Sequence, residues 1–381
     1  MSDVSGKLRV GFLTYGLDRP LSGVTRVAWE LGRRLNERED CEVVYLAPYR
    51  RGPFVDGNGY RAWYLPGCSR LPGLMALGGP LIALAARRLG LDVVHDPIGT
   101  NPFTVGRGLG PFKRVVTIHD AIAFRYPRGY PWLNNFLHRR YIPALLGQVD
   151  AVITVSRYSK RELTTFLGLP AASVAVVPNG VDERFRPLPA ASARAVAARY
   201  GLAGRYVLNV GAVQARKNLG QLLEAFARLH ALFPQHRLAI AGPSLWKHEG
   251  LQAQVSRLGL VDKVALLGYV ADEDLPALYG AAEAFVFPSL YEGFGLPPLE
   301  AMACGCPVVC SDATSLPEVA GDAALLVNAG DPEDLAEGMR RVLENGDLRM
   351  QLRERGLLRA GAFSWEETAR LTLDTYRRVA G

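Results

Sequence analysis

Short apolar runs alternate with amphipathic segments of helical length in two successive series, and this alternation limits the possible folds more than any other feature of the chain. Repeated strand–helix–strand units favour parallel pairing with helices on both faces of the sheet. Strands are predicted at residues 8–14, 41–47, 93–96, 114–119 and 151–156, and again at 206–211, 237–241, 264–267, 284–288 and 308–311. The first series has helix patterns at residues 23–35, 79–89, 132–146 and 157–167. We therefore predict an α/β protein with two doubly wound sheets.

The alternation stops after residue 182, and residues 183–204 read as a connector that contains a Pro-rich run and an Ala/Arg-rich run. A chain of 381 residues is also too long for one ordinary core and suits two domains of about 150–200 residues each. We expect domains at residues 1–182 and 183–364. Because ligands of open α/β sheets bind at the carboxyl ends of the strands, we expect the functional site in a cleft between those ends.

Basic residues are concentrated in the first half of the chain. Residues 1–182 hold 23 Lys and Arg against 14 Asp and Glu, a net charge of +9, and the remainder has 21 against 23, a net charge of −2. This imbalance favours a polyanionic partner. No recognised nucleic-acid motif is present, so an anionic membrane that carries a polyprenyl-phosphate acceptor fits better. A charge imbalance that only aids solubility is the alternative.

Three features bear on the compartment. Residues 1–6 are polar and no apolar region follows them, so we expect no secretory signal and a cytoplasmic protein. Residues 71–86 are the most apolar stretch, but Pro and Gly interrupt it and it is shorter than a membrane span. We therefore predict a helix packed on a sheet. The alternative is a face that touches a membrane. The five cysteines are expected to stay reduced, and the group Cys304, Cys306 and Cys310 has no nearby histidine for a zinc site.

The segment from Glu292 to Glu300 carries the most specific pattern in the chain. A turn follows the predicted strand 284–288, and a helix then begins with two prolines, which tolerate the missing N–H groups of a first helical turn. The amides of Gly293, Phe294 and Gly295 are expected to hold an anion or sugar oxygens near the positive helix end. Glu292 and Glu300 frame this turn from opposite ends. Taken singly, each glutamate also fits a solvated turn or a carboxylate placed by the helix dipole.

Two adjacent cations, Arg216 and Lys217, stand before a helix pattern for which Asn218 is the predicted N-cap. Positive charges at a helix start oppose the helix dipole, so their placement is unfavourable for stability alone. A diphosphate that pairs with both would remove the conflict, with arginine as a bidentate fork and lysine as a point charge. We therefore predict a diphosphate-binding role for this pair.

Two residues of the first half are weaker candidates. His119 lies at the carboxyl end of a predicted strand and faces the expected cleft, which favours a functional role over that of a structural histidine. Gly23 follows Leu21-Ser22 at the start of the first long helix, where it could admit a phosphate or serve only the turn.

Together these motifs resemble the retaining glycosyltransferases of family 4, also called group 1 glycosyltransferases, and in particular their bacterial mannosyltransferase-like branch. The resemblance runs from about Arg9 to the last helix and rests on the Glu-x7-Glu element, Arg216-Lys217-Asn218, Pro178-Asn-Gly-Val-Asp182 and Val155-Ser-Arg-Tyr-Ser-Lys160. It implies a GT-B fold, in which two Rossmann-like domains face each other across a cleft, with the acceptor mostly in the first domain and the donor in the second. It also implies that the C-terminal helix, residues 365–381, packs back on the first domain.

The resemblance also assigns roles by matching position. Arg216 and Lys217 would bind the donor diphosphate, Glu300 the ribose hydroxyls, and Glu292, helped by the amides of Phe294 and Gly295, the transferred sugar. His119 would contact the transferred sugar from the first domain, and Gly23 would let its loop approach the phosphates. The backbone around Tyr269 and Val270 would contact the base. Many family members carry more glycines near the position of Gly23. The expected catalytic residues are His119, Arg216, Lys217 and Glu292.

The implied reaction moves a hexose, by preference mannose from GDP-mannose, to a glycan or polyprenyl-linked acceptor with retention of the anomeric configuration. It requires no cofactor or metal, although Mg²⁺ binding is compatible with it. The alternatives are a UDP-sugar-dependent transferase for glucose or N-acetylglucosamine, a GT-B enzyme of another type such as a nucleotide-sugar epimerase, and a catalytically silent binding subunit. Peripheral contact with the inner face of the cell membrane would use the basic first domain.

Overall fold

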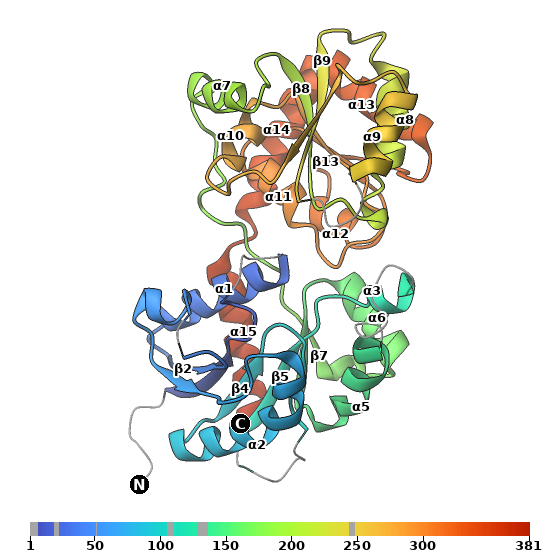
Figure 1. Cartoon of the computed structure of the whole chain (residues 1–381). Coiled ribbons are helices and arrows are strands. Elements are labelled where there is room, and N and C mark those ends of the chain that lie inside the picture. Colours follow the sequence, from blue (N-terminus) through green and yellow to red (C-terminus); the bar gives the residue numbers. More distant parts are fainter. Residues whose placement is uncertain are drawn as a thin grey trace. The chain divides into compact units, whose positions relative to one another are not determined.

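The structure is a computed structural model that describes residues 7–18, 23–50, 52–104, 110, 112–127, 136–243 and 248–381. The chain divides into two compact units (Figure 1). Unit 1 comprises Met1–Gly180 together with Trp365–Gly381, and unit 2 comprises Val181–Ser364.

Unit 1 is built on a parallel sheet of seven strands in the order β3-β2-β1-β4-β5-β6-β7. The strands are β1 (Leu8–Leu13), β2 (Cys41–Ala47), β3 (Ala62–Tyr64), β4 (Val93–Asp96), β5 (Lys113–Thr117), β6 (Ala151–Thr154) and β7 (Val174–Val176). The helices described for this unit include α1 (Gly23–Asn36), α2 (Leu71–Leu89), α3 (Ile122–Arg125), α5 (Ile142–Leu145), α6 (Arg157–Leu167) and α15 (Trp365–Ala380).

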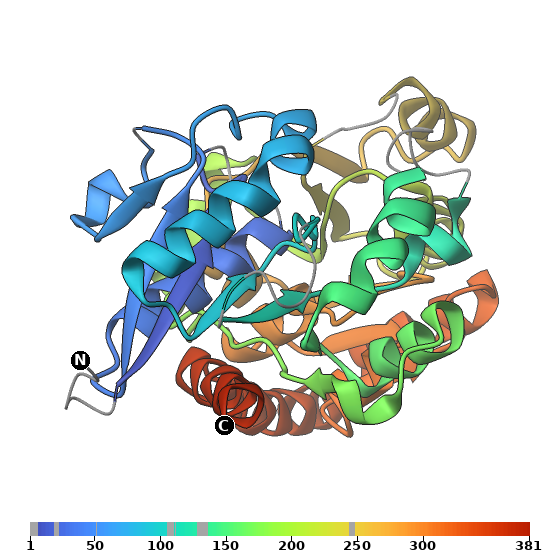
Figure 2. The same ribbon diagram turned by 90° about the horizontal axis from the view of Figure 1, so that it is seen from below.

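Helix α15 belongs to the core of unit 1 although it is the last element of the chain. It lies against α1 and reaches β5 and β6, and Figure 2 shows it beside the strands of this unit, in red, with the C-terminus at its end. Its residues Ala369, Leu373 and Tyr376 are buried with the apolar side chains of β1 and β2. The Tyr376 hydroxyl also bonds Nδ1 of the buried His95 at 2.7 Å, and Nε2 of that histidine bonds Thr117 at 2.8 Å. Apolar packing and a buried polar chain therefore both fasten α15 to the sheet.

Unit 2 repeats the plan with a parallel sheet of six strands in the order β10-β9-β8-β11-β12-β13. The strands are β8 (Arg205–Val210), β9 (His236–Ala241), β10 (Val264–Gly268), β11 (Ala284–Phe287), β12 (Val308–Ser311) and β13 (Ala324–Val327). The helices are α7 (Ala190–Arg199), α8 (Leu219–Leu229), α9 (His248–Arg257), α10 (Leu275–Ala281), α11 (Leu296–Ala303), α12 (Leu316–Ala320), α13 (Pro332–Glu344) and α14 (Gly346–Gly361).

The strand order reverses between β1 and β4 in unit 1 and between β8 and β11 in unit 2. At such a point the loops that leave two neighbouring strands diverge to opposite faces of the sheet and open a crevice at their carboxyl ends. The loops after β8 and β11 carry Arg216, Lys217 and Glu292, and the loop after β4 lies next to that after β5, which carries His119. The topology therefore places the expected site residues at strand ends.

The α/β fold class is confirmed, and the predicted strands recur with shifts of one or two residues at their ends. Helix α2 begins at Leu71, eight residues before the predicted start. Pro72 sits in the first helical turn, where its missing N–H costs nothing, and Pro80 lies inside the helix on the exposed side. The first part of the helix predicted at residues 132–146, up to residue 135, lies outside the described residues. From Leu137 it is one π-helical turn followed by α5.

Within the part of the chain that the structure describes, no helix is both long and apolar enough to cross a bilayer. The five cysteines are all buried and unpaired, as expected for reduced thiols.

Candidate functional site

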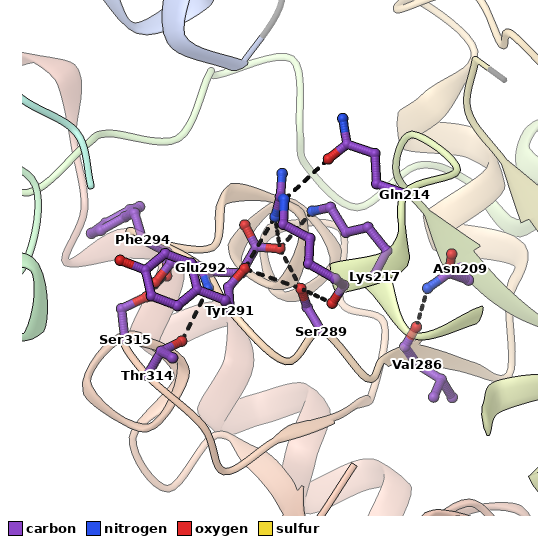
Figure 3. A network of polar contacts seen from close by, with 11 residues as sticks. Asn209, Gln214, Lys217, Val286, Ser289, Tyr291, Glu292, Phe294, Thr314 and Ser315 are labelled. Atoms are coloured by element: carbon purple, nitrogen blue, oxygen red, sulfur yellow. Dashed lines mark hydrogen bonds and ion pairs between the residues drawn. The ribbon is translucent and has the colours of Figure 1, made fainter. Parts of the chain in front are cut away.

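The centre of the candidate site is a cluster of charged side chains at the carboxyl ends of β8 and β11. The Glu292 Oε1 atom accepts hydrogen bonds from Arg216 Nη1 at 2.7 Å, from Lys217 Nζ at 2.6 Å and from the Ser289 hydroxyl at 2.6 Å (Figure 3). The two cations come from the turn before α8, and the acceptor and the serine come from the loop after β11. The fold thus joins two motifs that are 75 residues apart in the sequence.

These side chains are largely withdrawn from water. The exposed fractions are 22% for Arg216, 10% for Lys217 and 12% for Glu292. Burial lowers the pKa of Lys217, and Glu292 opposes that shift. Burial alone would raise the pKa of Glu292, but Lys217 and Arg216 hold it below the ordinary value. Two cations against one carboxylate leave one net positive charge, so the cluster can accept an anion without a further change of protonation.

Each cation has a second contact that fixes its direction. Arg216 Nε donates to Gln214 Oε1 at 3.0 Å, and Nη1 also reaches the carbonyl oxygen of Tyr291 at 3.1 Å. Lys217 Nζ lies 4.6 Å from the ring centroid of Phe287 at the end of β11. A buried lysine over an aromatic face gains a cation–π attraction that partly offsets its lost hydration. The cations are therefore held in place by contacts within the protein itself.

The turn after Glu292 is braced by two residues that the sequence did not single out. The Glu292 amide donates to Thr314 Oγ1 at 3.1 Å, and the Ser315 hydroxyl lies 2.9 Å from the carbonyl oxygen of Glu292 and 2.8 Å from that of Phe294. Thr314 has a φ of +59°, a conformation that costs a β-branched residue about 1–3 kcal/mol. The surrounding structure must enforce this conformation, which fits a site that depends on the exact course of the turn.

Gly295 is required where the turn enters α11. Its φ of +113° would strain any other residue, and a Cβ atom there would lie 2.7 Å from Leu316 Cδ2, so the Leu316 side chain would have to move. The neighbouring Phe294 is buried and packs edge-on against Phe363, with ring centroids 5.8 Å apart. Gly293 directly precedes Phe294 in the same turn.

Glu300 lies inside α11, one turn beyond the prolines, and its side chain is buried. The Tyr279 hydroxyl, from α10, donates to its Oε2 atom at 3.0 Å. Glu292 and Glu300 therefore belong to different segments, the turn and the helix, with separate hydrogen-bond partners. Tyr279 is a further residue that sequence reasoning missed.

Tyr269 and Val270 follow β10 directly and differ in exposure. Tyr269 is 71% exposed, whereas Val270 is buried. An aromatic ring so open to solvent at the carboxyl end of a strand offers a flat apolar surface, while its neighbour anchors the loop.

Asn218 occupies the predicted N-cap position of α8, and its carbonyl oxygen accepts from the Leu222 amide at 3.2 Å, but its side chain does not cap the helix. It has a left-handed φ of 58° and makes no side-chain bond to the first turn of α8. Its Nδ2 atom donates instead to the carbonyl oxygen of Ala329 at 2.5 Å. The side chain points elsewhere because this asparagine also ends the turn of Arg216 and Lys217 in the left-handed conformation, which asparagine tolerates better than most residues.

In unit 1, His119 follows β5 and is partly buried. Its Nε2 atom bonds the carbonyl oxygen of Pro97 at 2.9 Å, and burial lowers its pKa, which favours the neutral ring near pH 7. Gly23 is the first residue of α1, and a Cβ atom there would meet no heavy atom within 4 Å. Leu21 and Ser22 of the same motif lie outside the described residues. The space around Gly23 is consistent with a loop that a ligand can approach.

No local signal could have identified Tyr279, Thr314 or Ser315, because each contacts its partner in the site through the tertiary fold. Gln214 lies two residues before Arg216, but the sequence did not show that its side chain accepts from that arginine. Over the described residues, no group of three or more His, Cys, Asp or Glu is arranged to hold a metal ion.

Two family models together cover most of the chain. The group 1 glycosyl transferases match residues 201–359, and glycosyltransferase family 4 matches residues 21–185. The chain is 32% identical to O-antigen chain mannosyltransferase B of Escherichia coli, in an alignment that covers 97% of this chain and 100% of the relative.

Solved structures share the whole fold at lower identity. Sucrose-phosphate synthase from Thermosynechococcus elongatus has a TM-score of 0.78 at 23% identity, over 98% of this chain and 99% of that chain. Anabaena HepE, solved in complex with UDP and glucose, has a TM-score of 0.77 at 20% identity, over 97% of this chain and 100% of that chain. The GT-B fold predicted from the sequence is thereby confirmed.

Proposed function

The chain belongs to the group 1 glycosyltransferases of family 4 and is a hexosyltransferase, and from this premise we propose that it transfers mannose from GDP-mannose, with retention, to a glycan or polyprenyl-linked acceptor. The observation that carries the proposal is the cluster in which Arg216 and Lys217 converge on one oxygen of Glu292.

Arg216 and Lys217 bind the donor diphosphate in this proposal. Glu292 compensates only one of their two charges, so the cluster retains attraction for an anion before the donor arrives. Both cations are already oriented by second contacts, and preorganised charges stabilise a leaving group without reorganisation at the moment of reaction. The diphosphate needs charge stabilisation more than protonation, and these two side chains supply it.

Glu292 binds a hydroxyl of the transferred sugar. Among the described residues, all the side-chain hydrogen bonds to Glu292 end on Oε1. The second oxygen, Oε2, is therefore the acceptor that remains for a ligand hydroxyl. The cations hold the carboxylate ionised, which makes it an acceptor only.

The other roles in this proposal are those that the family resemblance implies. Glu300, held by Tyr279, binds the ribose hydroxyls, and the amides of Gly293, Phe294 and Gly295 surround the sugar. The exposed loop at Tyr269 and Val270 receives the base. His119 contacts the transferred sugar, and the open space at Gly23 admits the phosphates.

The preference for mannose rests on O-antigen chain mannosyltransferase B, whose alignment covers 97% of this chain, and the preference for GDP rests on the family resemblance. A UDP-sugar donor is the second candidate, because Anabaena HepE, with the same fold, binds UDP and glucose. The base is the feature that separates these two donors.

Retention follows if the acceptor attacks the face from which the diphosphate leaves, through a transition state with oxocarbenium character. Positive charge then develops on the sugar and negative charge on the diphosphate. The cations stabilise the second of these charges, and no described carboxylate is needed as a covalent nucleophile in such a scheme. The anomeric configuration of the product tests this part directly.

A membrane-held acceptor would place the enzyme in the cytoplasm, at the inner face of the membrane. Helix α2 presents the exposed side chains of Leu77 and Leu84 and ends in Arg87 and Arg88. No Asp or Glu occurs from residue 57 to residue 91. Apolar side chains beside cations suit the surface of an anionic bilayer.

Nucleotide binding tests the proposal before any acceptor is known. A ligand that binds only the folded protein raises its melting temperature, so GDP, UDP and ADP can be ranked in a thermal-shift measurement. We expect GDP to give the largest increase in melting temperature. Added salt should reduce the increase caused by GDP less than it reduces the increase caused by inorganic diphosphate. A larger shift with UDP would favour the second candidate, and no shift with any nucleoside diphosphate would contradict both.

A further inference from the structure

Asp96, the last residue of β4, is a fully buried carboxylate with all of its bonds directed at the loop that follows it. Oδ1 accepts from the Ile98 amide at 3.1 Å, and Oδ2 accepts from the Asn101 amide at 2.7 Å and from the Thr100 hydroxyl at 3.0 Å. Burial raises the pKa of Asp96 above the ordinary value, although these donors and the Gly99 amide oppose the shift. Because every partner donates, the ionised carboxylate is the form that satisfies them all.

The loop of residues 97–101 has a course that this carboxylate helps to enforce. Gly99 has a φ of +83° and Asn101 a φ of 47°, so two of its residues are left-handed. A Cβ atom at Gly99 would lie 2.8 Å from the carbonyl oxygen of Thr117, which ends β5. The loop therefore lies against the strand end from which His119 follows.

The loop and His119 meet at one hydrogen bond. The carbonyl oxygen of Pro97 is an acceptor only, so the His119 Nε2 atom, 2.9 Å away, must carry the proton. In the neutral ring, Nδ1 is then unprotonated and is an acceptor. Over the described residues, His119 makes no other side-chain hydrogen bond, so this one contact sets its tautomer and its orientation.

We propose that Asp96 is a positioning residue: through the loop of residues 97–101 it holds His119 in the tautomer that offers Nδ1 as a hydrogen-bond acceptor to the transferred sugar. The inference rests on the proposed function for the role of His119. It extends that function to a residue that touches no substrate, in the way that outer partners orient catalytic histidines elsewhere. Asp96 acts on the chemistry only through Pro97 and His119.

The direct test observes the tautomer in the ligand-free protein. The chain has six histidines, and ¹⁵N labelling of this residue type resolves protonated from unprotonated ring nitrogens by NMR. A His119→Gln spectrum assigns the resonances of His119 by their loss. The wild-type protein should show protonated Nε2 and unprotonated Nδ1. No nucleotide or sugar is present, so this readout does not depend on the donor.

Asp96→Asn replaces one acceptor oxygen with a donor, so at least one of the loop amides or the Thr100 hydroxyl loses its partner. We expect a mixture of the two His119 tautomers and a loss in kcat of about tenfold or more, with the Kd for GDP changed by less than about threefold. Asp92→Asn is the matched control. Asp92 accepts the Arg9 amide at 2.8 Å at the opposite end of β4, so its loss should leave both the tautomer and kcat unchanged.

Thr100→Val keeps the proposal testable if Asp96→Asn does not fold, since it removes only one of the donors to Asp96. It should give a smaller tautomer shift and a loss in kcat of about threefold. An unchanged His119 tautomer in the folded variants would overturn the inference, and so would an equal effect of Asp92→Asn. If the tautomer shifts as expected but the wild-type protein turns over no sugar nucleotide, the proposed function fails while the link between Asp96 and His119 stands.

Discussion

Lys217 and Glu292 are joined by a 2.6 Å hydrogen bond between Nζ and Oε1, and both side chains are almost fully buried. Such a pair forms only because the fold brings the loops after β8 and β11 together. Arg216 shares the same carboxylate oxygen, so the three charges act as one unit. Removing one member of a buried charged cluster changes the environment of the others, so the folding stability of each variant of this cluster has to be compared with that of the wild type.

Arg216→Ala should weaken GDP binding about 10- to 100-fold, because a charge-assisted hydrogen bond to a phosphate is worth about 1.5–3 kcal/mol. Isothermal titration with GDP measures this loss. Arg228→Ala is the control, since that arginine lies on α8 in an exposed pair with Glu333. Equal affinities for the wild type and Arg216→Ala would remove this arginine from the diphosphate site.

Glu292→Gln should lower kcat about 100-fold or more while GDP binds as tightly as before or more tightly. The substitution removes the charge that compensates Arg216 and Lys217, so attraction for the diphosphate persists, but the sugar loses its anionic acceptor. Steady-state kinetics and GDP titration separate the two effects. Glu224→Gln, which breaks an exposed pair with Arg257, serves as the control. Near-normal turnover in Glu292→Gln would exclude this glutamate from the catalytic account.

Glu300→Gln should abolish most of the preference for GDP over 2′,3′-dideoxy-GDP, since a carboxylate that accepts from both ribose hydroxyls is replaced by a neutral amide. A site built to bond hydroxyls rejects ligands that lack them, and we expect the wild-type preference to be about tenfold or more. Tyr279→Phe keeps the carboxylate and should retain most of the preference. A wild-type protein that binds both nucleotides equally would contradict the ribose assignment.

The buried His95 predicts a specific pH dependence of stability. Burial lowers its pKa from 6.5 to about 3. Below pH 6.5 the unfolded chain takes up a proton that the folded protein refuses, so the free energy of unfolding falls as the pH decreases from 6.5 towards 3. Between pH 6.5 and 5 this histidine alone should remove about 2 kcal/mol.

Urea unfolding at a series of pH values measures this dependence. His95→Gln should be less stable at pH 7, because Thr117 and Tyr376 lose their imidazole partner, but its stability should fall less steeply towards pH 5. Parallel curves for the wild type and the variant would show that His95 is not the group responsible.

Much of the fold could be predicted because its signals are local. The longer strands are β-branched runs bounded by turns, and the stripe of Leu219, Leu222, Leu223, Phe226 and Leu229 gives α8 directly. Strands β3 and β7 escaped prediction because three residues are too few for a distinct pattern, and β13 was missed because its residues Ala-Leu-Leu-Val fit a helix as well as a strand. The helix pattern at residues 79–89 missed the start of α2 at Leu71, although the apolar stretch of residues 71–86 was itself expected to form a helix.

In the candidate site, too, the features carried by local sequence motifs could be predicted, and those that depend on tertiary contacts could not. Arg216, Lys217, Glu292 and Glu300 stand in motifs whose spacing is visible in the sequence. Their hydrogen bonds are not visible there, and the most informative of them joins the two cations to Glu292 rather than leaving them unpaired for a diphosphate. The contacts of Ser315 and Tyr279 depend on tertiary structure alone, as does the link from Asp96 to His119.

The most direct test of the whole account is donor turnover by the purified protein. Release of the nucleoside diphosphate is measured with GDP-mannose, UDP-glucose and UDP-N-acetylglucosamine, each with a lipid-linked mannosyl acceptor and with the wild type and Glu292→Gln in parallel. We predict release of GDP from GDP-mannose by the wild type, dependent on the acceptor and lost in the variant. Faster turnover of either UDP-sugar, or GDP release that Glu292→Gln leaves unchanged, would contradict the account.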